Sequence, residues 1–174
     1  MYNYIELTTD LIENKVIDKN SVYDYSPNQL SDFYEQFYQF CQENLSTQWE
    51  KEQIDPARIF FNFENSFNAF ASKRPPYNLI GINYILPYSL VGDFNNFNEK
   101  VKAFFSAESI SEVFSEENFP PSLLITQFSL LYIYYHELGH ILQNNTTDFL
   151  TTENYNEEDF DFEKHLKEFD ADIF

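Results

Sequence analysis

The chain has 174 residues, which is enough for one domain with a buried core. Its 29 acidic residues outnumber the 10 basic ones, and the net charge of −19 repels nucleic-acid phosphates and anionic membranes and would favour a basic partner. The single cysteine, Cys41, excludes an intramolecular disulfide and a cysteine-rich zinc site, so a metal in this chain needs His or carboxylate ligands.

Neither membrane insertion nor secretion is indicated by the apolar segments. The longest apolar run, residues 123–135, contains Thr126, Gln127 and Ser129 and is too short to cross a bilayer, which needs about 20 apolar residues. Residues 1–6 show no basic segment followed by an apolar run, so we expect no secretory signal. We therefore predict a soluble, cytoplasmic protein with no membrane and no nucleic-acid partner.

The first long element is a predicted helix at about residues 27–51. Ser26 can cap it, Pro27 suits the first helical position, and Gln29 completes a capping box. An aromatic and aliphatic stripe follows at helical spacing and is predicted to be core: Phe33, Phe37, Phe40, Cys41, Leu45 and Trp49. The twenty residues at the start of the chain are compatible with helix or extended structure, and both stay open.

Three short strands are predicted next, at residues 59–63, 67–71 and 79–86. The segment 73–76, Lys-Arg-Pro-Pro, breaks the pattern between the second and third strands. We expect a small antiparallel sheet packed on helices, in an α+β fold.

The last part of the chain is predicted to be mainly helical. Residues 91–119 fit one or two short helices, and a helix from Pro121 to about Asn144 is apolar on nearly all sides, which predicts a central, buried helix. Residues 144–161 are acidic and polar and are predicted to be a solvated linker. An amphipathic helix from about residue 157 to the chain end is expected to follow it.

The central helix carries the sequence His-Glu-Leu-Gly-His at residues 136–140, which uses two of the three histidines in the chain. Residues four apart share a helix face, so His136 and His140 can direct imidazole nitrogens at one ion. Glu137 is then placed to act as a general base on a water molecule activated by that ion. This is the chemistry of the zinc metallopeptidase signature, and the pattern predicts a Zn²⁺ site.

Catalytic zinc usually has three protein ligands, and the last predicted helix offers candidates for the third. Glu168 and Asp172 are four residues apart and share a face, so Glu168 is predicted to bind the metal and Asp172 to accept the outer N–H of a ligating histidine. His165 lies on nearly the same face and is a candidate donor to the transition state. Tyr155 or another tyrosine fits that last role as well, and the choice stays open.

The two motifs together resemble the gluzincin metallopeptidases, in which His-Glu-x-x-His is followed by Glu-x-x-x-Asp. The final segment, Glu-Phe-Asp-Ala-Asp at residues 168–172, is similar to the form found in the CaaX-prenyl protease and heat-shock protease group. Phe-Asn-Ala-Phe-Ala at residues 67–71 is similar to a strand segment of that group. The resemblance implies that this strand aligns an extended substrate and that Asn68 and Ala69 contact it.

The resemblance covers residues 58–86 and 121–174, and it departs from the family's membrane members because their spans are missing. The phage-exclusion (Lit-type) peptidase branch fits a small cytoplasmic chain better. The chain ends at Phe174, two residues after Asp172, so we expect a single metallopeptidase-like domain over residues 1–174 that is truncated at its C-terminus or part of something longer.

The sequence thus predicts a zinc-dependent endopeptidase that acts on an intracellular protein or peptide, in phage defence or stress. Two alternatives stay open. One is an acidic protein without enzymatic activity, such as a DNA mimic or inhibitor, which binds a basic surface. The other is a degenerate peptidase in which zinc has a structural role only.

Overall fold

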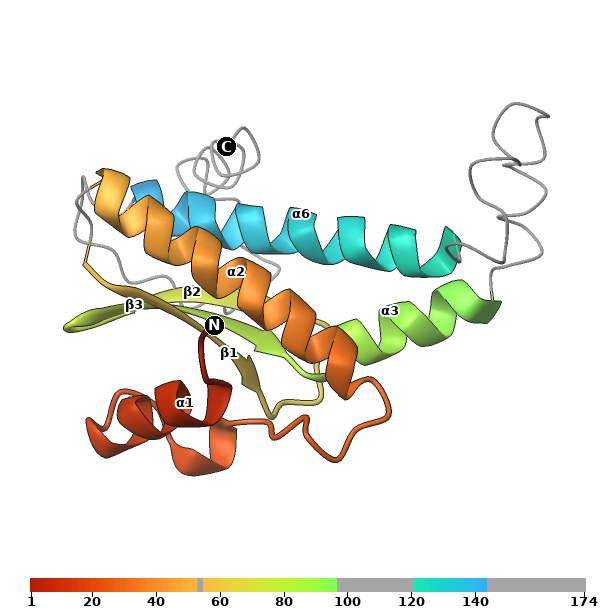
Figure 1. Cartoon of the computed structure of the whole chain (residues 1–174), viewed down its shortest axis with the longest axis horizontal. Helices are drawn as coiled ribbons and strands as arrows, with labels where there is room; N and C mark the ends of the chain where they lie inside the picture. The colour runs from red at the N-terminus through yellow and green to blue at the C-terminus, as the bar shows by residue number, and fades with distance from the viewer. Residues whose placement is uncertain (53–54, 97–120, 144–174) are drawn as a thin grey trace, which may run out of the picture.

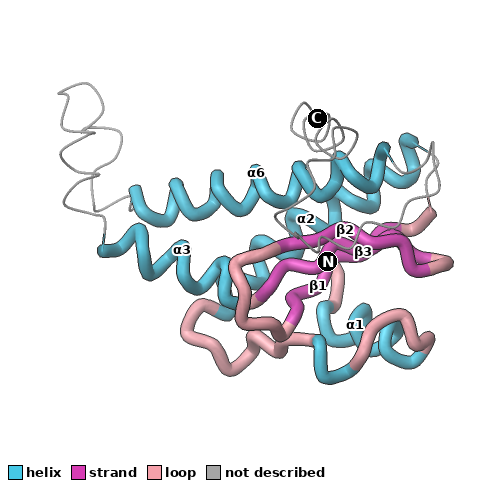
Figure 2. The backbone as a smooth tube through the Cα atoms, turned by 180° about the vertical axis from the view of Figure 1, so that it is seen from behind, coloured by secondary structure: helices cyan, strands magenta, loops and turns pink. Residues whose placement is uncertain are grey.

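The computed structural model describes residues 1–52, 55–96 and 121–143, and it has the predicted α+β class. Its elements are, in chain order, α1 (Tyr4–Glu13), the 3₁₀ turn η1 (Lys19–Ser21), α2 (Ser31–Glu52), β1 (Ala57–Asn62), β2 (Ala69–Arg74), β3 (Tyr77–Asn83), α3 (Ile85–Asn96) and α6 (Pro121–Gln143). The sheet forms a middle layer, with α1 on one side and α2 and α6 on the other (Figures 1 and 2). Over its described residues, no helix is long and apolar enough to cross a membrane.

The sheet is mixed, so the prediction of an antiparallel sheet was wrong for one of its two pairings. The strand order is β1-β3-β2, with β1 and β3 parallel and β2 and β3 antiparallel. The loop 63–68 leads past the end of β3 and is held there by Asn83, whose side chain donates to Ser66 Oγ at 2.7 Å. This loop leaves room for one strand between β1 and β2. The short turn after Arg74 reverses the chain, so that β3 enters this place parallel to β1 and antiparallel to β2.

The outer edge of β1 is closed by side chains of two helices. Gln42, which is fully buried in α2, donates to the Ala57 carbonyl at 3.2 Å and accepts from the Ile59 N–H at 3.1 Å. The Tyr4 hydroxyl accepts from the Phe61 N–H at 3.2 Å. These side chains satisfy backbone groups at a buried strand edge, where the Ala57 carbonyl also accepts from Arg58 at 3.1 Å. The end of the edge is covered by the segment after η1: the Tyr23 N–H donates to the Phe61 carbonyl at 2.9 Å, and Val22 forms a single antiparallel bridge with Asn62.

The core lies on both faces of the sheet and is rich in tyrosine. Tyr34 and Tyr38 of α2 are fully buried, and the ring of Tyr34 meets that of Phe61 edge-on at 4.9 Å between centroids. Within the predicted stripe of α2, Phe37, Cys41 and Leu45 are buried as expected. Phe33 and Trp49 are partly buried, whereas Phe40 is 46% exposed, so the stripe is rotated toward the two tyrosines.

Several predicted boundaries were wrong. The first two strands are Ala57–Asn62 and Ala69–Arg74, and not 59–63 and 67–71. Helix α2 begins at Ser31 and not at Pro27, because Asn28 accepts from the Leu30 N–H at 2.8 Å and holds the preceding residues in turns. The third strand ends at Asn83 and not at residue 86. Ile85 and Leu86 begin α3, whose first turn accommodates a proline without the loss of a helical hydrogen bond.

Helix α6 matches its predicted span but is less enclosed than predicted. Leu130, Tyr134 and Ile141 are buried, whereas Phe128 is 63% and Tyr132 is 60% exposed. The helix packs on β2, on α3 and, more lightly, on β3 and α2. One long face of α6 is therefore core, and the other carries exposed aromatic rings.

Candidate metal centre

The orientation of α6 is fixed by a buried tyrosine. Tyr134 is fully buried, and its hydroxyl lies 2.8 Å from Asn44 Oδ1 and 3.2 Å from the Cys41 carbonyl oxygen, both on α2. This burial raises the pKa of Tyr134 far above its usual value, so the hydroxyl stays protonated and can donate. A helix turns by about 100° per residue, so His136 and His140 lie about 200° and 240° around the axis from Tyr134. The anchor to α2 therefore directs both histidines to the opposite side of α6.

The two histidines converge on one point, as their spacing predicts. Nε2 of His136 and Nε2 of His140 are 3.2 Å apart, and the ring planes are nearly perpendicular at 89°. Two nitrogens that bind one tetrahedral zinc at 2.0–2.1 Å lie about 3.3 Å apart. The same separation also fits a hydrogen bond in which one ring carries the proton and the other accepts it. The separation therefore fits both a shared metal and a hydrogen bond between the two rings.

Glu137 and His140 are withdrawn from solvent. Glu137 is 6% exposed and His140 is 7% exposed, although each is polar or ionisable. Glu137 directly follows His136 and precedes His140 by three residues, so it belongs to the same stretch of α6 as the histidine pair. Low exposure strengthens the electrostatic interaction of a carboxylate with a nearby cation, because less water screens it.

The remaining predicted members of the site, Glu168, Asp172, His165 and Tyr155, lie outside the described residues. Within the described ranges, no group of three or more His, Cys, Asp or Glu side chains is arranged to hold a metal. The histidine pair and Glu137 are thus the part of the predicted site that the structure describes.

The second strand, which begins at Ala69 directly after Asn68, has an outer edge that is open as far as the described residues go. Strand β2 is at the end of the sheet opposite β1, and no described strand pairs with its outer side. The Asn68 carbonyl accepts from the Asn83 N–H at 3.0 Å, so the main chain of Asn68 faces β3. Along a strand, the main-chain N–H and C=O groups of successive residues point alternately to its two neighbours. The N–H and C=O groups of Ala69 and Ala71 therefore point away from β3, toward the outer edge. Of the two predicted residues, Ala69 therefore has its main chain on the open edge and Asn68 does not.

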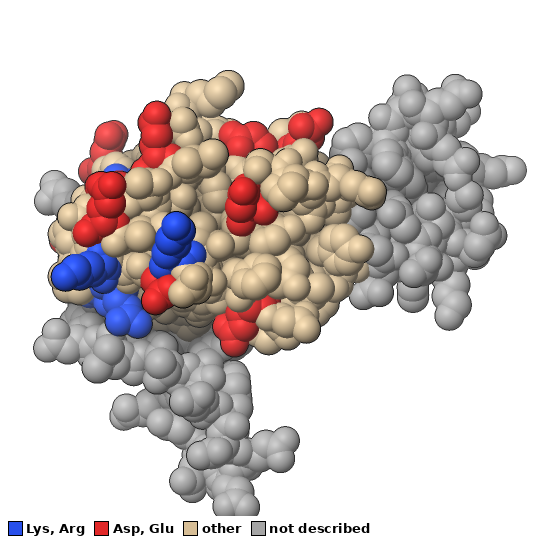
Figure 3. Space-filling model, turned by 90° about the horizontal axis from the view of Figure 1, so that it is seen from below, with Lys and Arg blue, Asp and Glu red and all other residues tan. Residues whose placement is uncertain are grey.

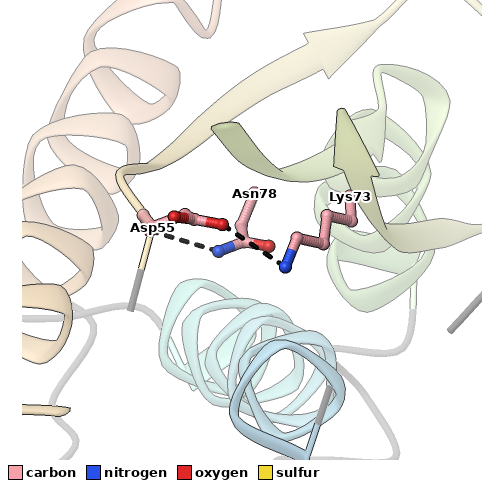
Figure 4. A network of polar contacts seen from close by, with 3 residues as sticks. All are labelled: Asp55, Lys73 and Asn78. Atoms are coloured by element: carbon pink, nitrogen blue, oxygen red, sulfur yellow. Dashed lines mark hydrogen bonds and ion pairs between the residues drawn. The ribbon is translucent and has the colours of Figure 1, made fainter. Parts of the chain in front are cut away.

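Ala71 is the residue of this edge that the sequence analysis missed. Its two-residue spacing from Ala69 was the available signal, because an edge that pairs with a peptide must use alternate residues. The far end of β2 is tied to the rest of the sheet: Lys73 Nζ lies 3.3 Å from Asp55 Oδ2, and Asn78 Nδ2 donates to the Asp55 carbonyl at 3.1 Å (Figure 4). The edge is therefore held in place at the end where the turn to β3 begins.

Comparison with models of known families, with curated proteins and with solved structures finds no match for this chain. The resemblance to gluzincins therefore remains a prediction from the two motifs.

Proposed function

We propose that this protein is a zinc-dependent endopeptidase of the gluzincin type, which hydrolyses peptide bonds of a protein in the cytoplasm. The observation that carries the proposal is the 3.2 Å separation of the two Nε2 atoms of His136 and His140, next to a buried Glu137. The resemblance adds the biological setting, phage defence or a stress response. Helix α6 packs on β2, so the helix that carries the histidine pair adjoins the strand that presents this edge.

Each residue has a defined task in this proposal. His136, His140 and Glu168 hold the zinc, and Asp172 accepts the outer N–H of one histidine, which fixes its tautomer. Zinc supplies Lewis acidity, which lowers the pKa of water toward neutrality and polarises the substrate carbonyl. Glu137 accepts a proton from the attacking water and passes it to the leaving amine. His165 donates to the oxygen on which negative charge develops.

The substrate is an extended peptide that pairs with β2. Ala69 and Ala71 present their N–H and C=O groups outward, and main-chain pairing of this kind recognises an extended backbone with little regard to sequence. The opposite edge cannot serve, because Gln42 and Tyr4 occupy the backbone groups of β1. Selectivity for an extended, locally unfolded segment follows from this geometry.

The zinc content tests the first step. Protein purified without added metal is expected to contain stoichiometric zinc, and His136→Ala and His140→Ala are each expected to lose it, because a zinc site with one protein ligand removed binds far more weakly. Elemental mass spectrometry gives the measurement. The matched control is His165→Ala, which alters the chain's third histidine and is expected to retain zinc. A parent protein without zinc would remove the proposal and favour an acidic binding protein, and equal zinc in all variants would remove the ligand assignment.

The role of the strand edge is tested with proline, which lacks an N–H. Ala71→Pro is expected to weaken the binding of an extended peptide about tenfold, since the outward N–H is lost and proline is tolerated at an outward-facing edge position. Ser72→Pro is the control, because its N–H faces β3, and it is expected to lower the melting temperature clearly more than Ala71→Pro does. Peptide affinity by fluorescence anisotropy and thermal unfolding report the two effects. Unchanged peptide affinity in Ala71→Pro would show that substrate does not use this edge.

A further inference from the structure

A cavity of about 770 Å³ lies on the face of the sheet opposite to α6. Its floor includes Phe60, Phe70 and Leu79, and its rim is formed by the segment from the end of α1 through η1. Small-molecule sites typically have volumes of roughly 300–1,000 Å³ with apolar walls and a few polar groups. The size and lining therefore suit a small organic molecule, and neither is used by the histidine site.

Three cations surround this cavity: Lys15, Lys19 and Arg74. The described ion pairs are Lys51–Glu52 and Lys73–Asp55, so none of the three has an ion-pair partner among the described residues. The chain has only 10 basic residues against 29 acidic ones, so three cations at one cavity form a local exception to its negative charge. Figure 3 shows this face, on which the Lys and Arg side chains gather in one region with Asp and Glu side chains beside them.

One acidic side chain, Asp18, also lines the cavity. Its Oδ1 accepts from the Asn20 N–H at 2.7 Å, which caps η1 and accounts for its presence. Three positive groups and one negative group leave a positive balance around the apolar floor.

Lys15 occupies a backbone position that normally selects glycine. Its φ of 58° is in the left-handed region, and the Val16 N–H donates to the Leu11 carbonyl at 2.9 Å, which is the closing bond of a Schellman motif. A Cβ at this position is unfavourable. A lysine near a helix C-terminus interacts favourably with the helix dipole, but this does not account for Arg74, which comes from β2.

The floor is shaped by Gly81 of β3. A Cβ built on Gly81 would lie 2.2–2.8 Å from ring atoms of Phe70, so the absence of a side chain lets that ring lie directly on β3. A flat aromatic surface thus forms part of the bottom of the cavity. It can stack with a planar or branched apolar group of a ligand.

We propose that this cavity binds a small organic anion, whose apolar body lies on Phe60, Phe70 and Leu79 and whose carboxylate, phosphate or sulfonate is held by Lys15, Lys19 and Arg74. The site is separate from the histidine pair, because Phe70, Ser72 and Arg74 face the cavity while α6 packs on the other side of the sheet. It stands independently of the peptidase proposal.

Two fluorescent probes of similar shape test the site: anilinonaphthalene sulfonate, which is anionic, and N-phenylnaphthylamine, which is neutral. We expect saturable binding of the anionic probe to the full chain. The double variant Lys15→Gln with Arg74→Gln is expected to bind the anionic probe about tenfold more weakly, because charge-assisted contacts are lost. Its affinity for the neutral probe is expected to stay the same. Ser72→Phe, which fills the cavity, is expected to weaken both probes.

The matched control is Lys51→Gln with Lys73→Gln, which removes the same charge from residues that do not line the cavity. Lys73 adjoins Arg74 in sequence but is paired with Asp55, and the two double variants change the net charge by the same amount. The proposal is overturned if the Lys15 and Arg74 variant binds the anionic probe like the parent, if the control loses as much affinity, or if Ser72→Phe binds both probes unchanged.

Discussion

Replacement of Glu137 by glutamine is expected to lower the rate of peptide hydrolysis about 10²–10⁴-fold, while the protein keeps its zinc. Glutamine has nearly the same shape as glutamate, so it fits the position that is 6% exposed, but its amide cannot accept a proton from water. The metal is held by other residues in the proposal, so its occupancy should not change. Cleavage of a quenched fluorescent peptide library and the zinc content, measured on the same preparation, separate the two effects.

Glu43→Gln supplies the control for this experiment. Glu43 is an exposed residue of α2, and the substitution removes the same charge without altering the histidine helix. Full hydrolysis in Glu137→Gln would exclude this residue as the general base. A cellular effect that survives in Glu137→Gln, with zinc bound, would instead favour a structural role for the metal.

Substitution of Gln42 by leucine is expected to lower the free energy of unfolding by about 1–3 kcal/mol, because it leaves the buried Ile59 N–H without its partner. The Ala57 carbonyl loses the bond from Gln42 but still accepts from Arg58 at 3.1 Å. Leucine fills a similar volume, so a cavity contributes little. Urea unfolding followed by circular dichroism measures the change.

Gln36→Leu is the matched variant for that measurement, because Gln36 is an exposed residue on the same helix. It is expected to change stability by about 0.5 kcal/mol or less. If Gln42→Leu were equally mild, the Ile59 N–H would have to find another partner, and the closure of the β1 edge would not depend on this side chain.

The sequence predicts the elements well where the signal is local. The span of α6 follows from its apolar run and its proline start, and the convergence of His136 and His140 follows from four-residue helical spacing alone. The two prolines of the predicted break at residues 73–76 do form the turn, although β2 continues through Lys73 to Arg74. In each case the residues that determine the feature lie within a few positions of one another.

The sequence does not predict features that depend on distant partners. The parallel pairing of β1 with β3 arises because β2 lies on the far side of β3, and no local pattern in the three strands encodes this order. Gln42 and Tyr4 close the β1 edge across 17 and 57 residues of chain, respectively. A third metal ligand is a contact of the same kind, so Glu168 remains a prediction from spacing and resemblance.

The difference between the two edges of the sheet gives the acid excess of the chain a physical role. An uncovered strand edge can pair with the same edge of a second molecule, which is a common route to aggregation. Each copy carries a net charge of −19, and like charges oppose the approach of two copies. At physiological ionic strength this repulsion acts over about 8 Å, which is longer than the spacing of paired strands. The net charge thus opposes self-association through β2, and a less acidic peptide meets less repulsion at the same edge.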